Sequence, residues 1–94
     1  MDETEVVHGI RVRYWAAAKS ASGVAEDVLA CDSPLTLAEI RARVVALHPG
    51  TRLGQILAAC STLVGDRPVG TADPAEVVVQ PGDHVEFLPP FAGG

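Results

Sequence analysis

Apolar and polar positions alternate along the first structured stretch of the chain. Ile10, Val12 and Tyr14 fall on one side of the alternation, whereas two arginines and Trp15 fall on the other. A period of two residues is typical of a half-buried strand, in which one face packs on a core and the other meets solvent. The pattern therefore predicts a strand from Ile10, with Trp15 pointing away from the core.

A second pattern, further along, marks the start of a helix. Thr36 and Glu39 have the spacing of a capping box, and Leu35 and Ile40 have the spacing of a hydrophobic staple. Together these signals predict that a helix begins at Leu37.

The predicted helix has one apolar stripe that would lie on a sheet. The stripe follows the i, i+3, i+7, i+10 spacing at Leu37, Ile40, Val44 and Leu47. Arg41 and Arg43 are expected to face solvent. The sequence His48-Pro49-Gly50 is expected to end the helix, because the residue before a proline disfavours helical geometry.

The other segments are shorter. The pattern predicts a hairpin loop at residues 16–23, a returning antiparallel strand at 26–31, one or two helical turns in 51–59, a strand at 60–64, a tight turn at Gly65-Asp66, an edge piece at 67–69, a loop at 70–76, a brief strand or extended connection at 77–79, a type II turn at Pro81-Gly82 and a final strand ending at Leu88. In that last strand Val85 and Phe87 share one face, and His84, Glu86 and Leu88 share the other.

This order of elements predicts an α+β fold with a mixed sheet. One main helix after the first hairpin can cover only one face of the sheet, so the other face stays open. If the final strand lies beside the first, Trp15 and Leu88 meet on the open face and form a docking patch. The alternative is that Trp15 merely covers neighbouring strand surface.

The end of the chain has its own chemistry. Pro89 and Pro90 lack backbone N–H groups, so strand pairing is expected to stop at Leu88 and the chain to leave the body extended. Gly93 and Gly94 have no Cβ and would fit a narrow channel. A frayed end without function is the alternative. The expected organisation is a flexible leader at 1–8, a domain at 9–88 and an extended tail at 89–94.

Composition excludes several classes of protein. The net charge of −5 argues against nucleic acid and anionic membranes as partners. No apolar run is long enough to span a membrane and the first residues are acidic, so the chain is expected to be cytoplasmic. Cys31 and Cys60 each lie in an apolar stretch and are expected to act as small buried hydrophobic residues. The three histidines lack a spacing that gathers ligands, so no metal site is predicted.

These features resemble a known family. The opening strand at residues 10–16, the helix at 36–47, the turn at 81–83 and above all the ending Pro89-Pro90-x-x-Gly93-Gly94 are similar to the sulfur carriers of the molybdopterin synthase small-subunit family. The resemblance spans residues 10–94. It implies a ubiquitin-like β-grasp fold with one main helix packed on one face of a mixed sheet.

The resemblance also implies a chemistry. In that family the chain is a carried substrate and not a catalyst by itself, and it binds no cofactor. An adenylyltransferase similar to ubiquitin-activating enzymes uses ATP to adenylate Gly94. A sulfur donor protein then supplies the sulfur of a thiocarboxylate. The carrier delivers this sulfur to a cyclic pyranopterin in the large synthase subunit, with which it forms a heterotetramer.

Site residues follow from the same resemblance. Gly94 would carry the sulfur and Gly93 would fit the channel, whereas Trp15 and Leu88 match large apolar partner contacts. Pro68 stands where the family often has an aliphatic contact residue. Phe91 is bulkier than the family's usual residue, which implies a wider channel or an added contact.

Three alternatives stay open. The same ending serves sulfur carriers for thiazole or amino-acid biosynthesis, and it serves ubiquitin-like modifiers that are joined to lysines of target proteins. The remaining alternative is a plain β-grasp interaction module, which would have no use for a free Gly93-Gly94 end.

Overall fold

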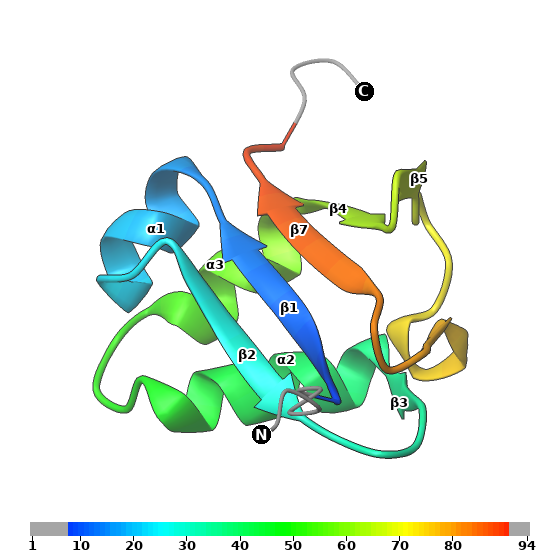
Figure 1. The fold of residues 1–94 in the computed structure, drawn as a ribbon. Coiled ribbons are helices and arrows are strands. Elements are labelled where there is room, and N and C mark those ends of the chain that lie inside the picture. Colours follow the sequence, from blue (N-terminus) through cyan, green and yellow to red (C-terminus); the bar gives the residue numbers. More distant parts are fainter. Residues whose placement is uncertain (1–7, 91–94) are drawn as a thin grey trace.

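A five-stranded mixed sheet organises the chain, and β1 (Gly9–Tyr14) lies inside it. In this computed structural model, which describes residues 8–90, β1 pairs antiparallel with β2 (Glu26–Ala30) and parallel with β7 (His84–Leu88). On its other side β7 pairs antiparallel with β4 (Ser61–Val64), which holds the short edge strand β5 (Arg67–Pro68). The predicted pairing of first and last strands is confirmed (Figure 1).

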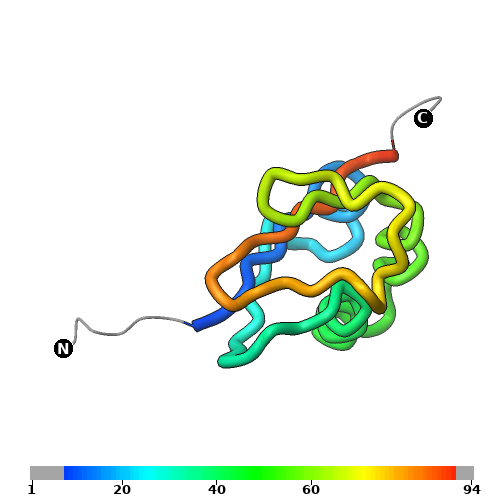
Figure 2. Tube along the Cα trace, turned by 90° about the vertical axis from the view of Figure 1, so that its right-hand side faces the viewer, coloured from blue at the N-terminus to red at the C-terminus, as the bar shows by residue number. Residues whose placement is uncertain are grey.

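The helices lie behind the sheet in Figure 1. Helix α2 (Leu37–Leu47) is followed by α3 (Leu53–Ala59), and a small second sheet joins β3 (Leu35–Thr36) to β6 (Val78–Val79). A 3-10 turn, η2 (Pro74–Glu76), precedes β6. Because β1 and β7 run parallel, the start of β1 and the end of β7 lie at opposite ends of the molecule (Figure 2).

The start of α2 forms as its sequence predicts. The backbone N–H of Glu39 donates to Oγ1 of Thr36 at 3.1 Å, and the backbone N–H of Thr36 donates to Oε1 of Glu39 at 2.8 Å. Two N-terminal N–H groups that a helix leaves unpaired are thereby satisfied. The helix begins at Leu37 and ends at Leu47, next to His48.

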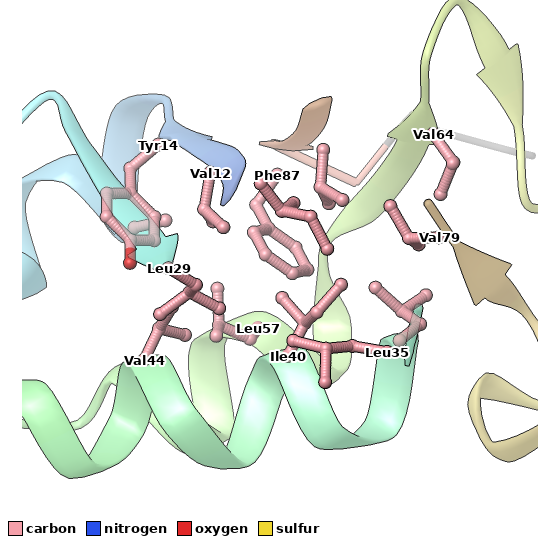
Figure 3. Packing of buried hydrophobic residues seen from close by; sticks show 14 of the residues in the cluster. Val12, Tyr14, Leu29, Leu35, Ile40, Val44, Leu57, Val64, Val79 and Phe87 are labelled. Carbon is pink, nitrogen blue, oxygen red and sulfur yellow. The ribbon is translucent and has the colours of Figure 1, made fainter. Parts of the chain in front are cut away.

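The core fills the space between the sheet and α2 (Figure 3). Phe87 is fully buried at its centre, with Val12 on the neighbouring strand and Ile40 and Val44 on the helix. The predicted stripe fails at one position, because Leu47 is 52% exposed. Arg41 also differs from its prediction: it is half-buried, and its Nε is shielded from solvent.

The predicted hairpin loop at residues 16–23 is wrong, because the chain forms helix α1 (Ala16–Ser22). Alanine has the highest helix propensity, and Ala18 and Ser22, one turn apart, are buried together. Gly23 ends the helix with φ 79, and its N–H donates to the Lys19 carbonyl oxygen. A left-handed backbone conformation is accessible to glycine at little cost because glycine has no Cβ, which explains why a glycine follows this helix.

The turn before β7 has the predicted geometry. Gly82 has φ 93, and the N–H of Asp83 donates to the Gln80 carbonyl oxygen at 3.0 Å. A positive φ at the third residue is what a type II turn requires. Of the predicted leader, only His8 is described, and its carbonyl oxygen accepts a hydrogen bond from Cys31 N–H.

Candidate docking face and tail root

Within residues 8–90, one face of the five-stranded sheet carries no helix, and we call it the open face. Its side chains follow from the strand register, since paired residues point the same way. The open face comprises Arg11, Arg13, Trp15, Glu26, Val28, Ser61, Leu63, Pro68, His84, Glu86 and Leu88. It combines charged groups near the start of β7 with apolar groups near its end.

Trp15 lies on the open face just beyond β1. Its backbone N–H donates to the Phe87 carbonyl oxygen at 3.1 Å, which extends the pairing of β1 with β7. The indole Nε1–H donates to Oε1 of Glu86 at 3.0 Å, and the Arg13 guanidinium lies 5.1 Å from the ring centroid. These contacts hold the ring in place, yet Trp15 is 40% exposed. A held, exposed aromatic ring is suited to docking.

Leu88 is the neighbour of Trp15 in the register. Tyr14 pairs with Phe87, so Trp15 and Leu88 stand one residue further along their parallel strands. Leu88 is half-buried and ends β7, and the two following residues, Pro89 and Pro90, are exposed. The structure thus brings Trp15 and Leu88 together at the root of the tail, as the sequence predicts.

Pro68 lies apart from this pair. It belongs to the edge strand β5, is exposed, and pairs with Leu63, which in turn pairs with Glu86 on β7. It therefore shares the open face but sits at the far edge of the sheet. The predicted site residues Phe91, Gly93 and Gly94 lie outside the described residues.

The charged part of the open face forms a hollow of about 530 Å³. Arg11, Arg13, Val28, His84 and Glu86 contribute to its lining. Both arginines approach Glu26, at 3.8 Å from Arg11 and 4.0 Å from Arg13. Exposed pairs of this kind contribute little to stability, so their main effect is to set the charge pattern of the face.

Sequence reasoning missed a cluster of ligating side chains on this face. Asp66, His84 and Glu86 each offer one atom, and the three atoms lie within 4.8 Å of one another. The signal was the spacing of His84 and Glu86, two residues apart on a strand, which puts both on one face. The spacing of the three histidines could not reveal this cluster, because it contains only one of them.

The two cysteines are not among the side chains of the open face. Both are free, half-buried and packed against the core. Burial raises the pKa of the Cys60 thiol, and the positive charge of Arg41 partly opposes that rise. These properties agree with the prediction of small hydrophobic residues.

Comparison with known proteins shows the family of the chain. The sequence profile of the ThiS family matches residues 12–94. The chain belongs to the ThiS family. The match begins in β1 and runs through β7 to the final Gly93-Gly94, so it includes both the domain and the tail.

Similar proteins carry related names. A molybdopterin synthase sulfur carrier subunit of Aspergillus niger is 27% identical over 84 residues, which cover 89% of this chain and 92% of that protein. The small archaeal modifier protein 1 of Methanosarcina acetivorans has a TM-score of 0.71 at 16% identity, covering 93% of this chain and 97% of that one. A third similar structure is the complex of subunits 1 and 2 of the molybdopterin-converting factor of Helicobacter pylori. One chain of that complex matches with a TM-score of 0.59 at 23% identity, and the match covers 92% of this chain and 99% of that one.

The structural matches confirm the predicted β-grasp fold. Among residues 8–90, no helix is long and apolar enough to cross a membrane.

Proposed function

We propose that this chain is the sulfur carrier of a molybdopterin synthase, with its sulfur bound to Gly94. The observation that carries the proposal is the ThiS-family match through residue 94, together with curated relatives named molybdopterin synthase sulfur carrier subunit. The geometry adds support, because β7 ends at Leu88 and the exposed Pro89 and Pro90 follow directly.

The proposed chemistry overcomes the poor reactivity of a carboxylate. A partner adenylyltransferase joins the Gly94 carboxylate to the AMP part of ATP, releasing pyrophosphate, and so creates a good leaving group. A sulfur donor protein then supplies sulfur at the sulfide oxidation level, which attacks the acyl carbon and displaces AMP, and this yields a thiocarboxylate. Its sulfur is nucleophilic and attacks a cyclic pyranopterin, and water then cleaves the bond between the Gly94 acyl carbon and the sulfur, so the sulfur stays on the pterin and Gly94 regains its carboxylate. The chain itself contributes the acyl group and no catalytic side chain.

In this proposal the folded domain is the part that binds the partner. A larger synthase subunit holds the open face around Trp15 and Leu88 while its own active site receives the tail. A two-subunit arrangement is supported by the Helicobacter pylori protein, solved as a complex of subunits 1 and 2. Phe91 would set the width of the tail channel, and Pro68 would add a contact at the edge of the sheet.

The fold alone does not separate this function from protein modification. The archaeal modifier protein shares the fold at 16% identity, and a similarity of that size says nothing of chemistry. The relatives detected by sequence favour the synthase carrier instead. Carriers for thiazole or amino-acid pathways are less favoured for the same reason.

The test is intact-mass spectrometry of the chain after incubation with its adenylyltransferase, ATP and a sulfur donor. We expect a gain of about 16 Da, the exchange of one oxygen for sulfur at the C-terminal carboxyl group. The thiocarboxylated chain, mixed with a large synthase subunit and the cyclic pyranopterin precursor, is expected to yield dithiolene.

Two controls make the result decisive. A chain lacking Gly93 and Gly94 keeps every described residue and is expected to show no mass gain and no dithiolene. A mass gain without dithiolene, combined with sulfur transfer to a thiazole precursor, would assign the chain to another sulfur pathway. Conjugation of the chain to target lysines without any thiocarboxylate would show it to be a modifier.

A further inference from the structure

Asp66, His84 and Glu86 meet on the open face although 18 to 20 residues separate the first from the other two. The Nε2 atom of His84 lies 3.8 Å from Oδ1 of Asp66 and 3.8 Å from Oε2 of Glu86. We propose that these three side chains form a binding site for a divalent transition-metal ion, with Zn²⁺ as the fitting ion.

The spacing suits such an ion. Zinc binds histidine nitrogen and carboxylate oxygen at 2.0–2.2 Å, so ligand atoms of a tetrahedral site stand about 3.4 Å apart. The two separations from His84 Nε2, 3.8 Å each, exceed this by a few tenths of an ångström, and the separation of the two carboxylate oxygens is at most 4.8 Å. Small side-chain rotations close that gap, because the Asp66 carboxylate is 98% exposed and free to turn.

The backbone fixes the three positions relative to each other. His84 and Glu86 are two residues apart on β7, so both side chains project from the same face. Asp66 lies in the turn between β4 and β5, and the N–H of the preceding Gly65 donates to the His84 carbonyl oxygen at 2.8 Å. The turn is thereby anchored to the strand that supplies the other two ligands.

Glu86 is already oriented for the role. Its Oε1 accepts the indole N–H of Trp15, whereas its Oε2 is the oxygen that faces His84. A hydrogen bond from a neighbouring group to one carboxylate oxygen commonly positions the other for a metal. The Glu86 side chain is only 18% exposed, so this orientation is held by packing as well.

The surrounding charges permit a cation. Arg11 and Arg13 share the face, but their ion pairs run to Glu26 on β2, and Arg13 lies over the Trp15 ring. Among the described residues, Glu86 forms no ion pair with an arginine. With His84 neutral, the cluster carries two negative charges and one imidazole, a mixed nitrogen and oxygen set that suits zinc.

Three protein ligands leave a fourth position open to water or to a ligand from another molecule. Since the cluster borders Trp15, a bound ion would sit within the open face. The proposal is independent of the sulfur chemistry, because none of its ligands belongs to the tail.

The test is calorimetric titration of the chain, prepared without a histidine tag, with ZnCl₂. We expect saturable binding of one ion per chain, weakened at least about tenfold in each of Asp66→Asn, His84→Ala and Glu86→Gln. Trp15→Phe, which lacks the indole N–H, is expected to weaken binding by about tenfold through loss of the orienting hydrogen bond. Co²⁺ is expected to quench the fluorescence of Trp15, the single tryptophan.

Matched controls exclude general effects. His8→Ala and Asp32→Asn remove an exposed imidazole and an exposed carboxylate elsewhere, and both are expected to bind Zn²⁺ like the parent chain. Asp66→Asn changes a side chain exposed to solvent, so it decides the result even if another variant unfolds. Unchanged affinity in either Asp66→Asn or a folded His84→Ala chain, or no saturable binding up to about 1 mM Zn²⁺, a free energy of about −4 kcal/mol, would overturn the proposal.

Discussion

The Tyr14 hydroxyl donates a 2.7 Å hydrogen bond to Oδ2 of Asp27, joining the paired strands β1 and β2 on the core side of the sheet. The same oxygen lies 2.6 Å from Nε2 of His48, at the end of α2. The Tyr14 ring also stacks on Phe87 with centroids 6.4 Å apart. One carboxylate therefore ties β1, β2 and α2 together.

Tyr14→Phe tests this tie. The change removes one hydroxyl and leaves Asp27 without one of its donors, so we expect a loss of about 1–2 kcal/mol in the free energy of unfolding at pH 8. Urea denaturation followed by circular dichroism measures it. Leu47→Ala, which truncates an exposed side chain in the last turn of α2, serves as a control and is expected to change stability far less.

The same variant reveals a pH dependence. Burial, and then the hydrogen bond and charge of Asp27, raise the pKa of Tyr14 above its ordinary value. The folded chain thus keeps the phenolic proton where the unfolded chain releases it, so this stability is full below about pH 10 and is lost as pH rises.

The difference in unfolding free energy between the parent chain and Tyr14→Phe should accordingly narrow by about 1 kcal/mol between pH 8 and pH 11. Comparing the two proteins cancels the titration of all other groups. A gap that stays constant over this range would show that Tyr14 ionises equally in both states.

Gly9 is a position where the sheet has no room for a side chain. A Cβ at Gly9 would stand 2.6 Å from the Leu29 carbonyl oxygen on β2. The clash is with backbone, which cannot rotate away, so we expect Gly9→Ala to cost about 1–3 kcal/mol of unfolding free energy. Thermal and urea denaturation measure the loss.

Gly54→Ala is the matched comparison. A Cβ there meets only Val45 side-chain carbons at 3.6 and 3.9 Å, which is ordinary contact. Gly54 lies in α3, where alanine is the better helix former, so a gain of about 0.5 kcal/mol is expected. Equal effects of the two substitutions would mean that the close approach at Gly9 is relaxed at little cost.

Local signals in the sequence were sufficient for much of the fold. The Thr36 and Glu39 pair fixes the start of α2 because both halves of the capping box lie within four residues. Helix α1 offered no such signal: its N-cap, Trp15, makes no side-chain cap, and Ala16 has φ 50. Leu47 matched the helical period, but it lies in the last turn of α2 and remains exposed.

Part of the candidate site could likewise be predicted from local patterns in the sequence, and part could not. Trp15 and Leu88 were predictable, because strand alternation sets their face and parallel pairing sets their neighbourhood. The approach of Asp66 to His84 was not, because it depends on the register between β4 and β7 and on a turn pinned by Gly65. Long-range register is not encoded in local spacing, so clusters built across strands appear only in the folded chain.

Cys60 should react slowly with alkylating agents. Burial raises the pKa of its thiol, so less of the reactive thiolate is present at pH 8 than for an ordinary thiol. In a Cys31→Ser background, we expect iodoacetamide to modify Cys60 more slowly than a free cysteine derivative, with the rate rising at higher pH. Adding Arg41→Gln removes the opposing positive charge and should slow the reaction further; faster reaction in that variant would contradict the assigned role of Arg41.

Trp15→Ala is expected to weaken binding to a large synthase subunit by about 2 kcal/mol, a typical loss for a central aromatic contact. The domain should stay folded, because Trp15 is 40% exposed and lies outside the core cluster. Calorimetric titration gives the affinity, and circular dichroism checks the fold. Leu47→Ala removes a comparably exposed apolar side chain from α2 and should leave affinity unchanged. If Trp15→Ala also binds normally, the partner does not use this end of the open face, and contact must rest on residues nearer Pro68.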